Sequence, residues 1–258
     1  MEKNIYTFWE PKSNIPEYLK LCIKTWEKFL PNFNIIILDY SNLNDYLEKD
    51  FYDKYLYSNF TLPQQSDAIR AAILYLNGGI WLDIDTIITS SKFLSLIDNQ
   101  KDFSLIKNHI CFINANNTSQ VLHNWVEDIK TNIRLHKEYA PNILKKYIDR
   151  KNYKNFIRWD YLGNSILNKY SDDIFHINDN YEQIFPEIKY CDKHFIKQTK
   201  RYKYFYFEQN FSENVLENSN GIICLHNSWT PKKYKNMPAQ EFLNQKCMLS
   251  GILNYLLD

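Results

Sequence analysis

Two aspartates separated by one residue, Asp83 and Asp85, are the strongest candidates for chemistry in this sequence. They lie in the stretch Ile80-Trp81-Leu82-Asp83-Ile84-Asp85, where apolar residues surround them. Charged groups in such a run are costly unless they are paired or bind a metal. Alternate residues of a strand point to one face, so the pattern predicts that both carboxylates project together. The alternative is an exposed strand end whose aspartates cap the following turn.

Paired carboxylates suit Mg²⁺ or Mn²⁺, hard ions that keep coordination positions open for phosphate oxygens. A phosphate-bearing substrate is therefore expected. The sequence contains neither GxxxxGK[ST] nor GxGxxG, so a P-loop or a Rossmann turn does not hold the phosphates. The metal would have to hold them.

An α/β architecture must position these aspartates. Apolar runs at residues 5–9 and 33–38 flank a segment after Pro16 with one apolar face, the order of a parallel strand-helix-strand unit. A second helix is predicted from Ser66 to Asn77-Gly78-Gly79, and the strand 80–85 follows it directly.

The remaining elements are expected further along the chain. The predicted strands are 103–106, 111–115 and 222–225, and the predicted helices are 118–133, 143–148 and 161–170. The last strand leads directly into His226.

Two stretches give a specific resemblance: Ser66-Asp67-Ala68-Ile69-Arg70, and Leu74 to Asp85 with its Asn-Gly-Gly-Ile-Trp-Leu-Asp-Ile-Asp. They resemble the signature of the DXD-sugar glycosyltransferases of family 32, and the opening Ile5 to Glu10 and the closing His226-Asn227-Ser228-Trp229 resemble its capsular polysaccharide synthesis branch. Capsular members often carry Ala-Thr after the first aspartate. Here a full Asp83-Ile84-Asp85 is kept, as in the mannosyltransferase and toxin branches, which favours metal dependence.

The resemblance implies a GT-A type fold with a mainly parallel central sheet, flanking helices and additional C-terminal helices. One transferase domain spans 1–258, with a nucleotide-sugar and metal half at 1–115, an acceptor half at 116–258 and a lid at 226–238. It implies a retaining transfer of a hexose of the galactose, glucose or mannose type from a nucleotide-diphosphate sugar, most simply a UDP-sugar, with Mn²⁺ or Mg²⁺. The acceptor would be a growing capsule, lipopolysaccharide or O-antigen glycan.

Three residues are expected at the metal. Asp85 is the predicted direct ligand, Asp83 would bind the metal or the ribose and sugar hydroxyls, and His226 would complete the coordination. The alternative for a lone histidine is a structural role.

The resemblance assigns the donor sugar to Asp67 and Arg70, which lie three apart at a helix start and can pair with each other. The alternative is a surface salt bridge of little energetic value. The further residues expected at the donor are Phe8, Trp9, Ser228, Trp229 and Lys232, with Lys233 as an alternative to Lys232 at the diphosphate. A catalytic nucleophile is not identified, and a same-face substitution needs none. Asp160 is a candidate acceptor contact or a helix cap.

Net charge gives no general attraction to nucleic acid, since 31 Lys and Arg face 30 Asp and Glu. Residues 189–207 are locally different: they hold six Lys or Arg, one Asp and seven Tyr or Phe. Basic and aromatic residues together suit a membrane interface or a single-stranded nucleic acid, and the transferase resemblance favours the membrane. We expect peripheral contact with the inner face of the plasma membrane, where a lipid-diphosphate-linked acceptor would lie. A folded strand with one solvated face explains the same residues.

Five dispersed cysteines without a CxxC spacing indicate buried reduced thiols. The sequence shows neither a signal peptide nor an apolar run long enough for a membrane span, so a cytoplasmic location is expected.

Three other functions compete with capsule-type transfer. A toxin-like glycosyltransferase acting on a protein is the main alternative. A non-catalytic sugar-binding or metal-binding module would not need Asp67, Arg70 and the aspartate pair together. A nucleotidyltransferase also uses Asp-x-Asp, but its preceding Gly-Ser turn is missing.

Overall fold

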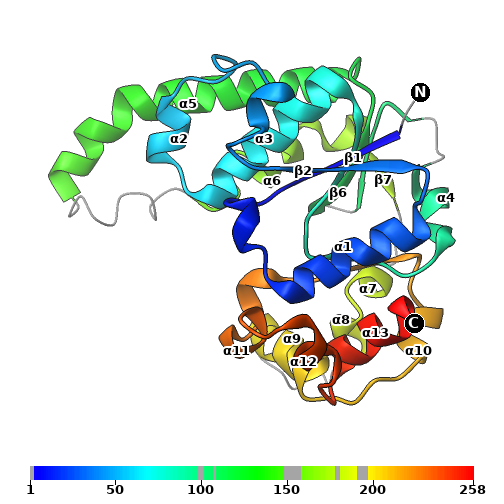
Figure 1. Ribbon diagram of the computed structural model, residues 1–258. Coiled ribbons are helices and arrows are strands. Elements are labelled where there is room, and N and C mark those ends of the chain that lie inside the picture. The colour runs from blue at the N-terminus through cyan, green and yellow to red at the C-terminus, as the bar shows by residue number, and fades with distance from the viewer. Residues whose placement is uncertain (1–2, 98–100, 107–108, 148–157, 178–180, 191–196) are drawn as a thin grey trace.

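A six-stranded sheet forms the centre of the upper body in the computed structural model, which describes residues 3–97, 101–106, 109–147, 158–177, 181–190 and 197–258 (Figure 1). The strand order is β2-β1-β3-β6-β5-β7. The strands are β1 (Lys3–Phe8), β2 (Phe33–Leu38), β3 (Gly79–Leu82), β5 (Phe103–Ile106), β6 (His109–Ala115) and β7 (Phe175–Ile177).

The predicted strand-helix-strand unit is confirmed. β1 and β2 pair in parallel from Lys3 opposite Phe33 to Phe8 opposite Leu38, and α1 (Glu17–Phe29) connects them. β3 is parallel to β1 on its other side. β6 runs antiparallel to both β3 and β5, so its first residues lie at the edge where β1 and β3 end.

The helix α3 (Leu62–Asn77) carries the residues that face the end of β3. It begins four residues before the predicted Ser66, because a capping box between Thr61 and Gln64 satisfies the free N–H groups of its first turn. It ends at Asn77, and the next residue, Gly78, has a φ of +64°, in the region that favours glycine; β3 then follows immediately.

Two helix predictions need correction. Residues 120–147 form one helix, α5 (Gln120–Tyr147), instead of separate helices at 118–133 and 143–148, and Pro141 lies within it. Residue 148 lies outside the described part of the chain. The segment predicted as a helix at 161–170 is a turn followed by the short α6 (Asn164–Leu167) and a 3₁₀ helix at Asn168–Asp173.

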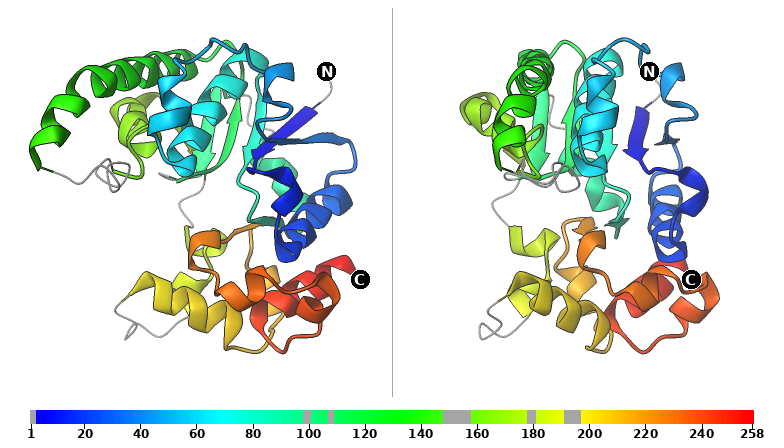
Figure 2. Two further views of the ribbon diagram at one scale, coloured as in Figure 1. Left: turned by 60° about the vertical axis from the view of Figure 1, so that its left-hand side comes forward. Right: turned by 90° about the vertical axis from the view of Figure 1, so that its left-hand side faces the viewer.

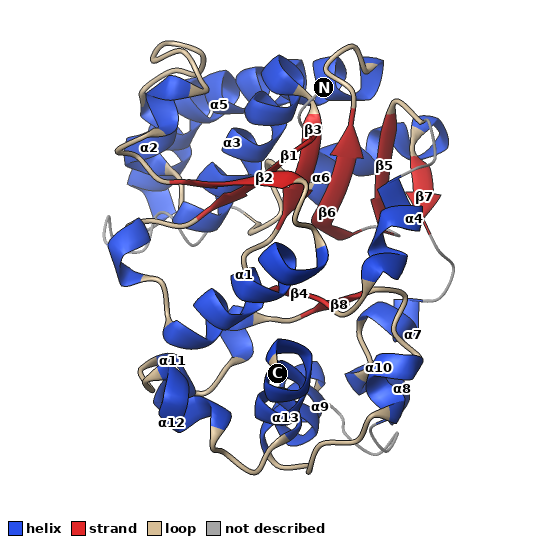
Figure 3. Ribbon diagram, turned by 45° about the vertical axis from the view of Figure 1, so that its right-hand side comes forward, coloured by secondary structure: helices blue, strands red, loops and turns tan. Residues whose placement is uncertain are grey.

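A second, two-stranded sheet lies below the first and pairs β4 (Thr86–Ile88) with β8 (Ile222–Cys224) in antiparallel fashion (Figure 3). We call residues 181–190 and 197–258 the C-terminal part. Figure 2 shows its helices gathered beneath the two-stranded sheet, away from α2 (Tyr55–Asn59), α3 and α5. The other described helices are α4 (Leu94–Ile97), α7 (Tyr181–Ile184), α8 (Glu187–Tyr190), α9 (Gln198–Phe207), α10 (Asn214–Glu217), α11 (Lys232–Lys235), α12 (Ala239–Leu243) and α13 (Met248–Leu257).

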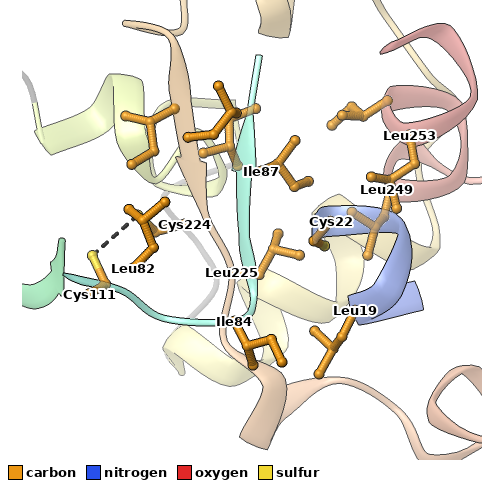
Figure 4. Close-up of a cluster of buried hydrophobic side chains, with 14 of the residues drawn as sticks. Leu19, Cys22, Leu82, Ile84, Ile87, Cys111, Cys224, Leu225, Leu249 and Leu253 are labelled. Carbon is orange, nitrogen blue, oxygen red and sulfur yellow. Dashed lines mark hydrogen bonds between the residues drawn. The ribbon is translucent and has the colours of Figure 1, made fainter. Parts of the chain in front are cut away.

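The two parts share a buried apolar core. Figure 4 shows Cys22 of α1 between the two-stranded sheet and Leu249 and Leu253 of α13, and Leu19 of α1 on the side of Ile84. The expected division at residue 115 does not follow the sheet, since β7 joins the six-stranded sheet beside β5 and β8 pairs with β4. Both halves of the sequence therefore build the framework around the aspartates.

Candidate active site

The turn from β3 to β4 carries both aspartates. The strand ends at Leu82, so Asp83 and Asp85 lie in the turn and not on one face of a strand as predicted. The backbone N–H of Asp83 donates to the carbonyl of Cys111 at 2.8 Å, and Thr86 N–H donates to the carbonyl of Asp83 at 3.0 Å. These bonds fix the turn at the carboxyl end of β3 and direct its two side chains to different partners.

Asp83 is held by the upper body. Its Oδ1 accepts from Arg70 Nη2 at 2.6 Å and from the indole N–H of Trp81 at 3.0 Å. Arg70, only 4% exposed, also donates to the carbonyl of Ile110 at 2.8 Å, and its guanidinium lies 5.0 Å from the ring centre of Trp81. The pairing of Arg70 with Asp83 was not predicted from the sequence; it is a partly buried, charge-assisted interaction.

Asp67 is buried one helical turn before Arg70, and its Oδ1 lies 3.6 Å from Arg70 Nη1. Burial raises the pKa of its carboxyl to about 7, with the charges of Asp83 and Asp160 adding to the rise and Arg70 opposing it. The surface-salt-bridge alternative does not describe this pair, because both side chains are at least nine-tenths buried. A costly buried acid beside a shared arginine is typical of a functional site.

Asp85 is held by the C-terminal part. Its Oδ2 accepts from the backbone N–H of Asn227 at 2.6 Å, and its carbonyl accepts from Leu225 N–H at 3.0 Å. Burial raises the pKa of Asp85 to about 7, and the charge of Asp83 raises it further, while the Asn227 bond opposes the shift. Burial and the neighbouring Asp83 thus disfavour the charged form of Asp85, and its backbone hydrogen bonds offset this only in part.

His226 precedes Asn227 and lies among aromatic rings. Its ring stacks on Phe185 at 5.4 Å between centroids and lies 4.0 Å from Trp229. Burial lowers the pKa of His226 to about 4, with His109 contributing, so the imidazole is neutral at pH 7. Its Nε2 lies 3.9 Å from Glu187 Oε1. Within the described ranges, His226 and the two aspartates do not form a group of three close enough to hold a metal. The metal assignment of Asp83, Asp85 and His226 stays a prediction.

The first predicted donor contacts lie at the same edge of the sheet. Because β1 and β3 are parallel with Tyr6 opposite Trp81, Phe8 and Trp9 come level with the start of the aspartate turn. Phe8 itself is buried and packs against Tyr40 with ring centroids 5.5 Å apart, whereas Trp9 is partly exposed. The position of Trp9 therefore suits a donor contact better than that of Phe8.

The segment expected to act as a lid, 226–238, is anchored. Tyr18 donates to the side chain of Asn227 at 2.6 Å, Thr230 bonds Tyr202 at 3.1 Å, and the ring of buried Tyr234 stacks on Phe207 at 4.5 Å. Three predicted contacts lie on this segment: Ser228 and Lys232 are exposed, and Trp229 is partly exposed.

The profile of the family described as capsular polysaccharide synthesis protein matches residues 1–245. The chain belongs to this family. The prediction from Asp67, Arg70 and the Asn-Gly-Gly-to-Asp85 segment is thereby confirmed.

Individual proteins that match this chain are more distant in sequence. The O-glycosyltransferase braB of Annulohypoxylon truncatum is 28% identical over 99 residues, a match that covers 34% of this chain and 24% of the relative. The match therefore spans about a quarter of that protein's length.

Among solved structures, PaToxG glycosyltransferase is 14% identical with a TM-score of 0.46, over 98% of this chain and 87% of that one. Glycosyltransferase GlyE of Streptococcus pneumoniae TIGR4 is 13% identical with a TM-score of 0.48, over 99% and 63%. The expected enzyme class agrees with the family and with the curated relative.

Several residues of the candidate active site were not predicted from the sequence. Asn227 bonds Asp85 through its backbone N–H, a contact that leaves no side-chain signal in the sequence. Glu187 is 3% exposed, and burial raises its pKa to about 7. The sulfurs of Cys111 and Cys224 lie 3.2 Å apart behind the aspartate turn (Figure 4). Cys22, Cys111, Cys224 and Cys247 are free and buried as expected, and Cys191 lies outside the described residues.

The basic and aromatic segment 189–207 is described in part, since residues 191–196 lie outside the described chain. Its second half is the helix α9 and not a strand. Four aromatic residues of this helix are buried in the core: Tyr202, Phe205, Tyr206 and Phe207. Lys200 and Lys203 remain exposed, so a membrane contact here would rest on charge. In the part of the chain that the structure describes, none of the helices is both long and apolar enough to cross a membrane.

Proposed function

We propose that this protein is a metal-dependent retaining glycosyltransferase that moves a hexose from a nucleotide-diphosphate sugar to a growing surface glycan. One observation carries the proposal: Asp85, a partly buried carboxylate held by a backbone N–H, lies beside an arginine-bound carboxylate, Asp83, at the carboxyl edge of the sheet. Open α/β sheets bind their ligands at this edge. Family membership supports the same conclusion.

The aspartate turn fits a divalent cation in its chemistry. The hydrogen bonds described for Asp83 end on its Oδ1, and the bond to the Asp85 carboxylate ends on its Oδ2, so each carboxylate has a second oxygen to offer. Carboxylate oxygens are the ligands that Mg²⁺ and Mn²⁺ prefer. A cation there would also relieve the repulsion that raises the pKa of Asp85. When bound, the ion supplies Lewis-acid stabilisation of the departing diphosphate.

The protein's own residues do the positioning. Arg70 orients Asp83 by charge-assisted bonding and shares its charge with Asp67, whose carboxylate would accept hydrogen bonds from donor sugar hydroxyls. The neutral His226 would be able to offer a nitrogen lone pair near the turn. Trp229 and Trp9 would cover the bound donor and exclude water, which limits hydrolysis.

Retention follows most simply from a same-face substitution. The bond between the anomeric carbon and the phosphate oxygen breaks as the acceptor oxygen approaches from the same side. The acceptor's proton passes to the departing phosphate oxygen. This path needs no protein nucleophile, and Asp67, Asp83 and Asp85 keep their binding functions throughout.

The finer parts of the proposal concern the substrates. We propose a UDP-hexose as the donor and a lipid-diphosphate-linked glycan as the acceptor. Lys200 and Lys203 on the exposed side of α9 would contact anionic headgroups at the membrane surface.

A thermal-shift screen with nucleotide sugars tests the proposal. A nucleotide sugar that binds the folded state raises Tm by mass action, and we expect this rise to require Mn²⁺ or Mg²⁺. In Asp85→Asn the metal-dependent rise should disappear, and slow hydrolysis of the donor should fall by about 100-fold or more, equivalent to ~2.7 kcal/mol.

The matched control is Asp53→Asn, which removes an exposed carboxylate paired with Lys137 at 2.6 Å. It should leave both measurements unchanged. Wild-type turnover in Asp85→Asn would refute the metal assignment, and the absence of any metal-dependent shift or hydrolysis across UDP- and GDP-sugars would refute the proposed activity.

A further inference from the structure

The turn at residues 158–163 presents a tryptophan to solvent beside Asp67. Trp159 is 68% exposed, whereas Trp26, Trp81 and Trp125 are buried and Trp9 and Trp229 are partly exposed. Burying an indole ring is strongly favourable, so the exposed ring of Trp159 is available to stack against another molecule.

The turn is fixed to the first turn of α3. The side-chain amide of Gln64 donates to the carbonyl of Arg158 at 2.9 Å, and Gln64 is itself 1% exposed. Asp160 is 6% exposed, and its carbonyl accepts from the N–H groups of Gly163 and Ser165, both at 3.1 Å. The residues on either side of Trp159 are therefore bound to the body, and the indole is the group that the turn presents outward.

The same turn touches the proposed donor site. A side chain at Gly163 would place its Cβ 2.4 Å from Asp67 Oδ2 and 2.9 Å from Ile110 Cδ1. Only glycine leaves room for the Asp67 carboxylate at this position. Asp67 thus lies between Arg70 on one side and the turn on the other.

Charge indicates which kind of ligand the turn would bind. The guanidinium of Arg158 donates to Asp160 from Nε at 3.1 Å and from Nη2 at 2.9 Å. This two-point pairing offsets its charge, so within the described turn 158–163 the face beside Trp159 is aromatic and carries no unpaired charge. Such a face suits a neutral pyranose ring, whose C–H groups pack against aromatic rings.

We propose that Trp159 is the platform on which the terminal neutral pyranose of the acceptor stacks, next to the donor sugar at Asp67. The inference rests on the proposed transferase function and adds the chemical class of acceptor and the residue that holds it. The acceptor hydroxyl would then approach the anomeric carbon from the side of the 158–163 turn.

Transfer and hydrolysis separate this inference from the proposed function. The donor is the nucleotide sugar that the wild type hydrolyses, and the acceptor probes are methyl β-glucoside, methyl β-galactoside and methyl α-mannoside. In Trp159→Ala, kcat/KM for transfer to the best probe should fall about tenfold through KM, while donor hydrolysis changes less than twofold. Trp159→Phe, which keeps an aromatic face, should retain at least half of the transfer activity. The control Tyr255→Ala removes a ring that is 51% exposed on α13 and should change neither rate.

Fluorescence gives a second measurement that does not depend on turnover. The methyl glycoside should protect wild-type tryptophan emission from acrylamide quenching, and this protection should be absent in Trp159→Phe. A parallel loss of hydrolysis and transfer in Trp159→Ala, or equal protection in wild type and Trp159→Phe, would overturn the platform. If the wild type hydrolyses no nucleotide sugar, the proposed function fails, and the quenching result alone decides whether Trp159 binds a pyranose.

Discussion

The upper α/β body and the C-terminal part each hold one of the two aspartates, and they hold them differently. The body gives Asp83 a full positive charge at 2.6 Å from Arg70 and an indole N–H from Trp81. The C-terminal part gives Asp85 the backbone N–H of Asn227, and the pKa of Asp85 is raised to about 7 by burial and by Asp83.

This difference indicates that the two aspartates of the Asp-x-Asp pattern have different functions. Asp83 is oriented by a charge partner and would contribute to a site that is built before any ligand binds. Burial and Asp83 disfavour the charged form of Asp85 in the free protein, and a bound cation would stabilise that form. Asp85→Asn, described above, should therefore abolish metal binding without unfolding the protein.

The largest further loss of stability should come from removing the positive charge of Arg70 in the upper body. Arg70→Met leaves Asp67 and Asp83 without their shared cation in a buried setting, so we expect a loss of about 3–5 kcal/mol in the free energy of unfolding. Urea unfolding measures this loss. Arg134→Met, at an exposed position of α5, should cost little.

A double variant tests whether Asp83 depends on that charge. Arg70→Met combined with Asp83→Asn should be less destabilised than the sum of the two single variants, because the uncompensated charge is removed together with its partner. Additive losses would show that Arg70 stabilises the body through packing alone, and the contrast between the two aspartates would then be wrong.

The pH dependence of stability offers a smaller test on the same side. The folded-state pKa of Asp67, about 7, lies above its ordinary 3.8, so the folded protein binds a proton more tightly than the unfolded chain between these values. The stability contributed by the protonated acid is complete below pH 3.8 and is lost as the pH rises to 7. Asp67→Asn removes this loss. At pH 8 it should be more stable than the wild type by on the order of 1 kcal/mol, a few degrees in Tm, and at pH 5 the difference should shrink.

Donor hydrolysis completes the Asp67 test. The variant should lose activity although it gains stability, because the amide replaces a carboxylate that accepts hydrogen bonds from the donor. An equal Tm difference at pH 5 and pH 8 would mean that Asp67 stays ionised throughout this range.

The sequence predicted the body better than the C-terminal part. The runs 33–38 and 103–106 became strands because continuous apolar segments between chain-breaking residues have few other stable structures. The segment 80–85 misled because its apolar residues continue past Leu82, whereas the backbone turns at Asp83 to join β4.

The remaining differences between the predictions and the structure come from contacts between residues that are distant in the sequence. Asp85 was expected to bind the metal directly and Asp83 to bind the metal or donor hydroxyls, but spacing alone does not reveal which of them meets an arginine. In α9, Tyr202, Phe205 and Tyr206 follow helical spacing, so the pattern for a buried helix face was present in a segment that its lysines made look like a surface.

The smallest predicted effect is on UDP binding, and it distinguishes between lysines of the C-terminal part, which holds Asp85. Lys232 was predicted at the diphosphate, but it is exposed, and Lys233 lies over the ring of Tyr234 at 4.5 Å. Lys235 is partly buried; burial lowers its pKa, and the charge of Asp85 opposes that shift, which places Lys235 within electrostatic reach of the aspartate turn. Lys235→Met should therefore weaken UDP binding several-fold in a Mn²⁺-containing thermal-shift titration, while Lys232→Met should change it less than twofold. Equal losses in the two variants would mean that the C-terminal part attracts the diphosphate through general surface charge, and raising the salt concentration should then abolish both effects together.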